Sequence, residues 1–530
     1  MAGHEHPSRA VARSTRGMVA SPHALATAAG VDVLRRGGNA VDAAIATNAV
    51  LAVVYPSSCG IGGDALWLLY EPRTREVVAY NGSGRAPKAL EASFLRERGY
   101  RAMPLRGAYT VTVPGAVRSW EDVARAHGTR DLDELLAPAQ AYARDGFVAT
   151  DVVACAFALN EDALRSDADA CALFVRLGPP HPGEVLRNPP LADALGSIRR
   201  HGAAGFYDGA TAAAICATLQ HQGNPMTLED LAAQRTERMV PVRLLWRGAE
   251  VVAHPPNSQA AVASMVLGML ERDGGACDLD WTHLAIEAFK EAFDARDARF
   301  AEPASMEPID DLLAPAELAR MRARLDPQRA RIRRAVPDRG GTVAVVAVDG
   351  DGRAVSLIES LYTGFGSGIV ARGTGVFLHN RGTYFSLQPG HPNELGGGKR
   401  PLHTLSPAML LRDGMPELVY GTMGGDGQPQ THVQLLHNVY ERGLSLQQSI
   451  DAPRFVYGRD SESAFADAVR LESRMPAEVV AGLRRRGHAV ELVGPFDRAL
   501  GHCHAIALDR ARGSLAGGSD PRADSLALGL

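Results

Sequence analysis

The sequence predicts a soluble protein built from closely packed layers of α-helices and β-sheets. Its 530 residues are 46% hydrophobic but only 6% aromatic, and 55 of them are glycine, a composition that suits tight packing between layers. Residues 119–222 and 228–299 have mainly helical patterns, whereas short strands and turns follow residue 342. At roughly 150 residues per domain the length allows about three domains, but it also allows one large layered fold.

Charge and hydropathy exclude several classes of protein. The 56 basic and 60 acidic side chains give a net charge of −4, which argues against a protein that grips nucleic acid by bulk charge. No segment approaches the ~18 consecutive apolar residues of a membrane span. Residues 1–17 are polar and lack the apolar core of a secretory signal, so we expect a cytoplasmic protein with no membrane partner.

The cysteines are scattered and form no C-x-x-C pair, so we expect buried free thiols rather than a disulfide framework. They are Cys59, Cys155, Cys171, Cys216, Cys277 and Cys503.

The N-terminal part reads as two helices followed by a turn and a strand. Ser21-Pro22 is a candidate N-cap for a helix that ends at Gly37-Gly38. Residues 41–54 are apolar nearly all round, which predicts a buried helix. The glycine-rich stretch 60–64 lacks a phosphate-binding pattern and its flanks do not form a dinucleotide unit, so we interpret it as a tight turn before a strand at 65–70.

Eight arginines fall within residues 320–339, which we interpret as a solvated linker. The pattern then changes abruptly to two β-branched apolar runs, 342–348 and 354–362, flanking Asp-Gly turn chemistry, and this predicts a hairpin. A loop centred near Asp351 places Thr342 opposite Ser360. Further on, residues 476–485 predict a helix.

The junction between Gly341 and Thr342 has the residue types that a self-cleaving threonine nucleophile needs. A threonine hydroxyl is a poor nucleophile until a base takes its proton. If the bond before Thr342 were cut, its own α-amine, with a reference pKa of about 7.7–8.0, would lie beside the hydroxyl as a base. Gly341 would tolerate the strained dihedral angles of self-cleavage. The alternative is that Thr342 merely begins a strand, and spacing alone leaves both interpretations open.

Short segments along the whole chain, in the right order, resemble the γ-glutamyltransferase family of autoprocessing N-terminal-nucleophile hydrolases. These segments are 17–23, 37–44, 60–64, 341–342, 365–369, 399–402, 406–407, 423–425, 452–454 and 520–522. The resemblance implies an α+β fold, a four-layer αββα sandwich. It also implies a large subunit, 1–341, that ends in the arginine-rich linker at about 320–341, and a small subunit, 342–530, the two together forming one fold.

The resemblance also assigns catalytic roles. It implies cleavage between Gly341 and Thr342, with Thr342 as the nucleophile and Ser360 as its hydroxyl partner. The two backbone N–H groups of an oxyanion hole map onto Gly424 and Gly425. Glycines suit this role because no side chain keeps the donors from the developing oxyanion.

The departures from the family concern the groups that hold a glutamyl zwitterion. Ser83 stands where the family has the arginine that pairs with the α-carboxylate, and Tyr384 where it has the acid that holds the α-amine. Tyr362 replaces an asparagine, and His403-Thr404 a pair of hydroxyls. The segment from residue 385 to 400 is also shorter than in members with a lid. Because a buried ammonium without its carboxylate is costly, we expect a substrate other than glutathione.

The leading hypothesis is therefore an autocleaving amidohydrolase that forms an acyl-enzyme on Thr342, similar to the oxamate amidohydrolase and cephalosporin acylase members. Two alternatives stay open: a γ-glutamyl transferase or hydrolase acting on glutathione-like donors, and an unprocessed, non-catalytic binding protein. The expected partner is a small-molecule amide, whose carboxylate, if it has one, would meet a basic side chain. Candidate substrate-binding residues, each of which could instead be structural, are Arg85, Tyr362, Arg381, Tyr384, Arg400, His403 and Thr404.

No metal or cofactor is expected. His502-Cys503-His504 lies in a strand-like run without a third and fourth ligand at zinc spacing, so we interpret it as core packing. We interpret His4-Glu5-His6 as part of a disordered end. A serine-hydrolase site is excluded by the lack of a G-x-S-x-G elbow. Whether the chain forms homo-oligomers is left open.

Overall fold

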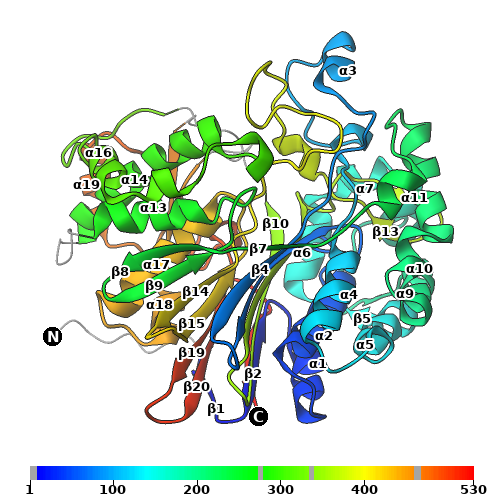
Figure 1. The fold of residues 1–530 in the computed structure, drawn as a ribbon, viewed down its shortest axis with the longest axis horizontal. Helices are drawn as coiled ribbons and strands as arrows, with labels where there is room; N and C mark the ends of the chain where they lie inside the picture. The colour runs from blue at the N-terminus through cyan, green and yellow to red at the C-terminus, as the bar shows by residue number, and fades with distance from the viewer. Residues whose placement is uncertain (1–8, 272–277, 334–339, 459–466) are drawn as a thin grey trace.

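Two seven-stranded antiparallel sheets face each other, and helices cover both outer faces (Figure 1). The computed structural model describes residues 9–271, 278–333, 340–458 and 467–530. Within these residues the chain forms the αββα sandwich that the resemblance implies, so that expectation is confirmed.

The first sheet, called sheet I here, has the strand order β21-β2-β10-β11-β3-β4-β7. Its strands are β2 (Gly17–Ser21), β3 (Asp64–Glu71), β4 (Glu76–Gly82), β7 (Glu237–Met239), β10 (Gly341–Asp349), β11 (Ala354–Tyr362) and β21 (Leu526–Gly529).

The second sheet, sheet II, has the order β1-β20-β19-β15-β14-β9-β8. Its strands are β1 (Ala12–Ser14), β8 (Val242–Trp246), β9 (Ala249–Ala253), β14 (Ala408–Arg412), β15 (Met415–Thr422), β19 (Cys503–Asp509) and β20 (Ser514–Ser519). Smaller sheets pair β5 (Phe147–Val148) with β6 (Val185–Leu186), β12 (Val370–Ala371) with β13 (Val376–Phe377), and β16 (Phe455–Tyr457), β17 (Ala468–Glu472) and β18 (Ala489–Val493) with one another.

One helical layer shares a core with the outer face of sheet I. It contains α1 (Ala24–Arg35), α2 (Ala40–Val54), α4 (Ala116–His127), α5 (Leu132–Asp145), α6 (Asp151–Leu159), α7 (Glu161–Arg165), α8 (Ala168–Ala170), α9 (Pro189–His201), α10 (Ala204–Tyr207), α11 (Ala210–His221) and α12 (Leu228–Ala232). The short helix α3 (Ala92–Glu97) stands apart at the top of Figure 1.

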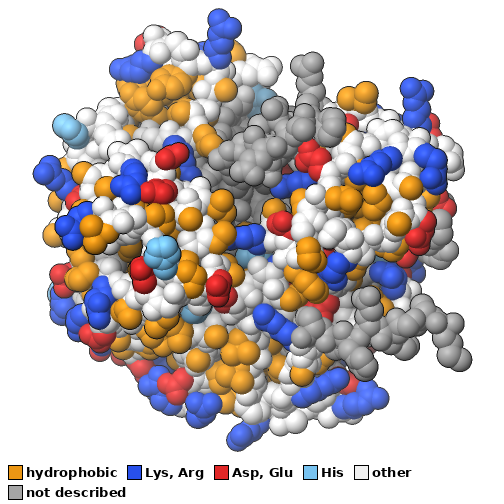
Figure 2. Space-filling model, turned by 180° about the vertical axis from the view of Figure 1, so that it is seen from behind, with side chains coloured by type: hydrophobic (Ala, Val, Ile, Leu, Met, Phe, Trp, Pro, Cys, Tyr) orange, Lys and Arg blue, Asp and Glu red, His pale blue; other side chains and the backbone are white. Residues whose placement is uncertain are grey.

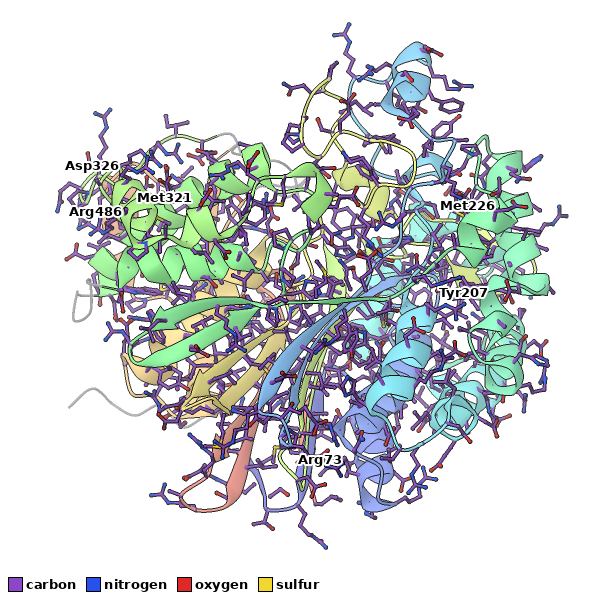
Figure 3. The ribbon with its side chains drawn as sticks, in the orientation of Figure 1. Arg73, Tyr207, Met226, Met321, Asp326 and Arg486 are labelled. Atoms are coloured by element: carbon purple, nitrogen blue, oxygen red, sulfur yellow. The ribbon has the colours of Figure 1, made fainter. Side chains whose placement is uncertain are left out.

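The other helical layer shares a core with the outer face of sheet II. It contains α13 (Ala261–Leu270), α14 (Asp278–Arg299), α15 (Asp310–Leu313), α16 (Pro315–Arg322), α17 (Gly427–Tyr440), α18 (Leu446–Asp451) and α19 (Ala477–Arg485). Figure 3 shows the two layers on opposite sides, with Tyr207 and Met226 in one and Met321 and Arg486 in the other. A third apolar cluster, including Met18, fills the space between the sheets.

Several predicted elements are confirmed and others are wrong. The buried helix is α2, in which all fifteen side chains are buried. The helix before it does not start at Ser21, which belongs to β2; α1 is capped by His23, whose Nδ1 accepts a hydrogen bond from Leu25 N at 3.2 Å. The mainly helical interpretation of 228–299 is also wrong in part, because β7, β8 and β9 lie within it. Burial alternates along β8, but the sequence does not, because Leu245 is apolar and exposed, so no period-2 pattern revealed this strand.

The predicted hairpin is β10–β11, and its register agrees with the prediction. Val343 pairs with Glu359, and this spacing continues to the pair of Val348 and Ala354. A bulge between Gly341 and Val343 shifts the last pair, so that Gly341 lies opposite Tyr362. Bulges of this kind redirect side chains and often lie beside active sites.

The arginine-rich segment is not simply solvated. Arg320 and Arg322 belong to α16, and the following residues return along α14. There Arg331 and Arg333 form ion pairs with Asp294 at 2.7 and 2.5 Å, and the Arg333 side chain is only 10% exposed. The chain is therefore anchored as far as residue 333, and residues 334–339 of the predicted linker lie outside the described part.

The cysteine prediction is confirmed in part. All five described cysteines are free, and Cys59, Cys216 and Cys503 are buried, but Cys155 is exposed. Cys277 lies outside the described residues. Among the helices of the described residues, none is both long and apolar enough to cross a membrane. Figure 2 shows basic and acidic side chains interspersed over one face, in keeping with the small net charge.

Candidate active site

Thr342 and Ser360 are neighbours at the open end of the β10–β11 hairpin. The Thr342 hydroxyl donates a hydrogen bond to Ser360 Oγ at 3.1 Å, and each residue is 1% exposed. This confirms the position that the hairpin register predicts for them. In the intact chain the pair lies under the Gly341–Thr342 peptide bond, away from solvent.

Ser360 Oγ connects the groups around that peptide bond. It donates a hydrogen bond to the Gly341 carbonyl oxygen at 2.6 Å and accepts one from the backbone N–H of Tyr362 at 2.7 Å. With this geometry the Thr342 hydroxyl can pass its proton to Ser360 while Ser360 passes its own to the Gly341 oxygen. Tyr362 has φ = 78°, a left-handed conformation that is strained for a non-glycine residue and that brings its N–H to Ser360.

Arg381 lies directly behind Ser360. It belongs to the short helix η4 (Arg381–Tyr384) and is completely buried. Its guanidinium donates to Thr404 Oγ1 at 3.0 Å and to Ser360 Oγ at 3.4 Å. It also lies over the rings of Tyr362 and Tyr384, at 4.5 and 5.6 Å from their centroids, as in a cation–π contact. Of the predicted substrate-binding residues, these four are brought together beside the threonine.

An anionic side chain balances this cation. Asp64 begins β3 opposite Ser360, and its carboxylate accepts a hydrogen bond from His403 Nε2 at 3.2 Å. Burial by itself raises the pKa of Asp64, but His379, the bond from His403 and the charge of Arg381 together hold it below its usual value. Burial and the nearby Arg381 lower the pKa of His403 to about 3. His403 is therefore neutral and does not offer a positive charge to a substrate anion.

Gly424 and Gly425 follow β15 and lie against Gly340, the second residue before the predicted cleavage site. A Cβ atom on Gly340 would be 2.6 Å from both Cα and N of Gly425. Both glycines adopt positive φ, 129° and 52°, so the turn depends on their freedom. In the intact chain Gly340 therefore covers the backbone that the family resemblance assigns to the oxyanion hole.

Two predicted anion partners lie away from this cluster. Arg85 forms ion pairs with Glu237 and Glu302, each at 2.9 Å. Arg400 pairs with Glu237 at 2.6 Å and donates to the Ser83 carbonyl oxygen at 2.8 Å. The structure thus places both arginines in a network that joins β7 to the 83–85 and 398–400 segments, and we no longer assign them to substrate.

Tyr384, which replaces the family's acidic residue, has an acidic neighbour, Asp426. Its hydroxyl donates to Asp426 at 3.4 Å, and Asp426 is held by Arg296 through contacts of 2.5 and 3.1 Å. Its ring meets that of Tyr362 edge to face, with centroids 5.0 Å apart. The two rings pack against each other and against Arg381, which in turn donates to Ser360.

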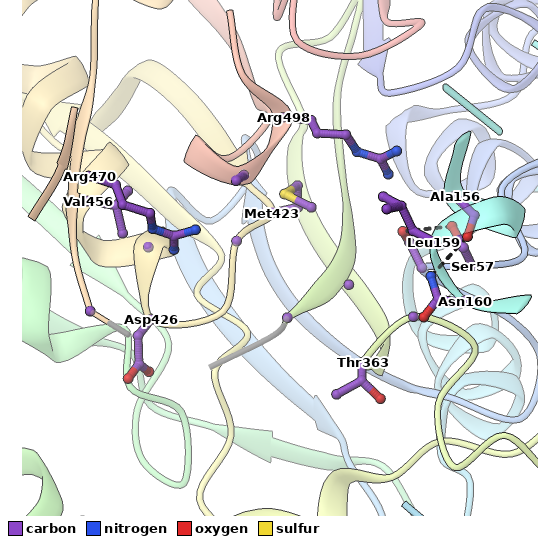
Figure 4. A pocket seen from close by; sticks show the side chains of 18 of the residues that line it. Ser57, Ala156, Leu159, Asn160, Thr363, Met423, Asp426, Val456, Arg470 and Arg498 are labelled. Atoms are coloured by element: carbon purple, nitrogen blue, oxygen red, sulfur yellow. Dashed lines mark hydrogen bonds between the residues drawn. The ribbon is translucent and has the colours of Figure 1, made fainter. Parts of the chain in front are cut away.

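A cavity of about 290 Å³ opens in front of the cluster (Figure 4). Gly341 and Gly424 line it, so it adjoins both the bond to be cut and the candidate oxyanion hole. Its other lining residues include Ser57, Asn160 and Thr363, which Figure 4 shows around the first residues of β10.

Sequence reasoning missed two buried acids of the site, Asp64 and Glu359. Burial raises the pKa of Glu359 to about 8. Its carboxyl accepts bonds from Gly60 N and Asn48 Nδ2, both at 3.1 Å, and so fixes the glycine-rich turn that leads into Asp64. A lone acid within an apolar strand, directly before Ser360, was the signal that could have revealed Glu359.

Among the described residues no group of three or more His, Cys, Asp or Glu side chains could hold a metal ion. His502 and His504 are buried, and burial lowers their pKa values to about 3 and 4. The segment 4–6 lies outside the described residues.

Three comparisons relate the chain to known proteins. A profile of the gamma-glutamyltranspeptidase family matches residues 26–530. The chain is 39% identical over 529 residues to the glutathione hydrolase-like YwrD proenzyme of Bacillus subtilis, covering 97% of this chain and 99% of that protein. It is 37% identical over 529 residues to the oxamate amidohydrolase proenzyme of Klebsiella pneumoniae, with the same coverage.

The fold also matches a solved structure. Cephalosporin acylase from Bacillus halodurans superimposes with a TM-score of 0.92 and 36% sequence identity, over 100% of this chain and 99% of that one. The likeness extends over both sheets and both helical layers, and so includes the site.

Proposed function

Because this chain belongs to the gamma-glutamyltranspeptidase family and is an amide-bond hydrolase, we propose that Thr342 is its nucleophile and becomes N-terminal by self-cleavage. The hydrogen bond from Thr342 to Ser360, which in turn donates to the Gly341 carbonyl, is the observation that carries this proposal. The mature enzyme would then consist of a large subunit, 1–341, and a small subunit, 342–530.

Self-cleavage would proceed as an acyl shift from nitrogen to oxygen. The Thr342 hydroxyl attacks the Gly341 carbonyl carbon and gives its proton to Ser360, whose own proton moves to the carbonyl oxygen. The C–N bond then breaks, and the Thr342 nitrogen takes up a proton. Water hydrolyses the resulting ester, which leaves a carboxylate on Gly341 and frees the Thr342 hydroxyl.

The same groups would act on an external amide. The free α-amine of Thr342 takes the hydroxyl proton as the oxygen attacks the substrate carbonyl. The backbone N–H groups of Gly424 and Gly425, uncovered once Gly340 has moved away, stabilise the oxyanion, where one donor typically contributes about 3–4 kcal/mol. The amine leaves with a proton, and water releases the acid.

We further propose that the acyl group is neutral or carries a single negative charge, not the zwitterion of a γ-glutamyl donor. Arg381 is the only charged side chain within hydrogen-bond distance of Ser360 among the described residues, and it is a cation. The rings of Tyr362 and Tyr384 lie against the Arg381 guanidinium. An ammonium group there would meet a guanidinium and two phenol rings instead of a free carboxylate.

The alternative, hydrolysis or transfer of γ-glutamyl groups, takes support from the name of the Bacillus relative, a glutathione hydrolase-like protein. We place it second because of the cationic Arg381. The chain is proposed to act in the cytoplasm.

The decisive experiment compares purified wild type with Thr342→Ala and Thr342→Ser. Wild type should separate into two fragments on a denaturing gel, with Thr342 at the new N-terminus by Edman sequencing. Thr342→Ala should stay a single chain, and Thr342→Ser, which keeps a hydroxyl, should still split. Cleavage of the alanine variant, or a different N-terminus, would show that the nucleophile is misassigned. An uncut wild type would favour a non-catalytic binding protein.

A further inference from the structure

The turn that carries the candidate oxyanion hole consists of two glycines, which do not hold a conformation by themselves. Gly424 and Gly425 have φ values of 129° and 52°, and glycine loses more conformational freedom on folding than any other residue. An oxyanion hole stabilises its intermediate only if the donors are oriented before the reaction. Contacts from outside the turn must therefore supply the rigidity that the two glycines lack.

Backbone hydrogen bonds fix the two ends of this turn. At its start, the N–H of Met423 donates to the His502 carbonyl oxygen at 3.2 Å. At its end, where α17 begins, the N–H of Gly427 donates to the Gly424 carbonyl oxygen at 2.7 Å. Met423 and Asp426, which flank the two glycines, both line the cavity and are labelled in Figure 4.

A side chain from a distant part of the sequence, Gln259, holds the middle of the turn. Gln259 lies between β9 and α13, is completely buried, and is anchored by its own N–H, which donates to the His403 carbonyl oxygen at 2.8 Å. Its Nε2 donates to the carbonyl oxygens of Gly425 at 2.8 Å and Thr404 at 3.2 Å. The Gly425 carbonyl also accepts a bond of 3.1 Å from the N–H of Gln428, so two donors fix its direction.

Arg296 of α14 determines which way the Gln259 amide faces. Its guanidinium donates to Gln259 Oε1 at 2.5 Å. Because a guanidinium can only donate, the amide oxygen must face it, which leaves the amide nitrogen for the carbonyl groups. Arg296 is itself only 2% exposed and is held by Asp297 at 2.8 Å and Asp426 at 2.5 Å. The amide therefore has one orientation, in which it donates to Gly425.

The same amide links the turn to the other side of the site. Thr404, whose carbonyl oxygen accepts from Gln259, also accepts through its hydroxyl from Arg381 at 3.0 Å. Arg381 donates in turn to Ser360 Oγ at 3.4 Å. Gln259 thus sets the position of the turn relative to Ser360, the partner of Thr342. A misplacement of about 1 Å can lower a rate by roughly a hundredfold, so this spacing matters for catalysis.

We propose that Gln259 is a positioning residue for hydrolysis, which keeps the N–H groups of Gly424 and Gly425 aimed at the oxyanion, and that Arg296 orients its amide. The inference rests on the proposed function, in which these two N–H groups stabilise the tetrahedral intermediate. It assigns a role in the reaction to a buried side chain that acts through the backbone of the turn.

The two reactions of Thr342 should depend on Gln259 to different degrees. In the intact chain the Gly341 carbonyl oxygen accepts from Ser360 Oγ at 2.6 Å, while Gly340 covers the Gly425 backbone. Self-cleavage therefore relies on Ser360 and not on the glycine donors. Hydrolysis of an external amide, in contrast, needs the turn that Gln259 holds.

Two variants test this difference. Gln259→Leu removes the amide, whereas Gln259→Glu keeps its shape and, ionised beside Arg296, still accepts from it but has no N–H for Gly425. Both should self-cleave within about threefold of the wild-type rate, while kcat/KM for glutaryl-p-nitroanilide falls on the order of tenfold to a hundredfold. Loss of both reactions together would mean that Gln259 supports the fold as a whole, and would overturn the positioning role.

A binding comparison on the processed proteins identifies the state that loses its contacts. 4-Boronobutanoate forms a bond from its boron atom to the Thr342 oxygen, whose proton passes to the α-amine, and the tetrahedral adduct resembles the intermediate. Glutarate has the same carbon chain but forms no adduct. Both Gln259 variants should bind 4-boronobutanoate on the order of tenfold to a hundredfold more weakly than wild type, and glutarate about equally. Equal losses for the two ligands, or an unchanged boronate affinity, would overturn the proposal.

Gln140→Leu is the matched control, because Gln140 makes the same kinds of contact in the helical layer over sheet I. Gln140 is buried, its Nε2 donates to the Ala192 carbonyl oxygen at 3.0 Å, and its Oε1 accepts from Arg199 at 2.5 Å. This variant should keep wild-type turnover and boronate affinity, and equal effects at the two glutamines would overturn the proposal. A processed wild type that neither cleaves the anilide nor binds the boronate would count against the proposed function and this inference together. Variants that match an active wild type would overturn this inference alone.

Discussion

At the scale of single residues, we expect Tyr384 to determine whether a γ-glutamyl donor can be used. Glutaryl-p-nitroanilide differs from γ-glutamyl-p-nitroanilide only by the absence of the α-amine. Losing one partner of a buried charge pair costs roughly 2–5 kcal/mol, so the γ-glutamyl compound should have a kcat/KM lower by on the order of a hundredfold. Equal turnover of the two compounds would contradict this assignment and favour the transferase.

Two variants of Tyr384 test whether its hydroxyl or the missing negative charge controls the choice between these two compounds. Tyr384→Phe removes the hydroxyl that contacts Asp426 without adding charge, and should leave the ratio of the two rates nearly unchanged. Tyr384→Asp places a carboxylate beside Arg381 and should move the ratio toward the γ-glutamyl compound by about tenfold or more. A larger effect of the Phe variant would show that the hydroxyl, not the missing charge, controls selection.

Glu359 should make the stability of the fold depend on pH. Burial raises the pKa of its carboxyl from an ordinary 4.5 to about 8, so between these values the folded chain holds a proton that the unfolded chain has lost. The bound proton stabilises the folded chain. This contribution to the free energy of unfolding is complete below pH 4.5 and is lost as the pH rises toward 8, at up to ~1.4 kcal/mol per pH unit.

The Glu359→Gln variant, which cannot ionise, should therefore lose less stability than wild type between pH 6 and pH 8. Urea unfolding of the uncut Thr342→Ala chain, with and without Glu359→Gln, measures this at both pH values. Because the glutamine loses the bond from Asn48, only the change with pH is diagnostic, not the absolute stability. Parallel pH profiles for the two proteins would show that Glu359 is ionised in the fold.

At the scale of elements, the β10–β11 hairpin was predictable and much of its surroundings was not. Asp-Gly turn chemistry between two apolar runs fixes the register, and the register alone places Thr342 beside Ser360. Asp64, His379 and Arg381 reach the same point from segments far apart in the sequence. Local sequence patterns carry no information on contacts between residues so far apart in the sequence, so these contacts could not be predicted. The strand β8 was missed for a local reason: its exposed residue Leu245 is apolar, so the sequence does not alternate as its burial does.

Because Gly340 lies so close to the turn after β15, a larger side chain at this position should slow self-cleavage. A methyl group on Gly340 would lie 2.6 Å from the Gly425 backbone, which cannot move aside as a flexible side chain would. Overpacking typically costs about 1–3 kcal/mol, so Gly340→Ala should slow the appearance of the two fragments by roughly fivefold to a hundredfold. Gly209→Ala, where the nearest atom is 3.9 Å away, is the matched control and should be cut at the wild-type rate. Equal rates for both variants would contradict a tight contact at Gly340.

At the scale of the whole molecule, the segments before and after Thr342 are interleaved in both sheets. In sheet I, β10 pairs with β2 on one side, and β11 with β3 on the other. In sheet II, β14 pairs with β9, and β20 with β1. Every one of these pairs joins a strand of the large fragment to a strand of the small one. The apolar cluster between the sheets likewise takes side chains from both.

Cleavage at Gly341 should therefore leave one molecule and not two. Pulling the fragments apart would break all four of these strand pairs and expose the core between the sheets, whereas the cut itself breaks none of them. We expect both fragments to elute together in size-exclusion chromatography at neutral pH, at the volume of the uncut Thr342→Ala chain. They should separate only in denaturant. Elution as two species without denaturant would mean that the fragments are independent domains, which the interleaved strand order does not permit.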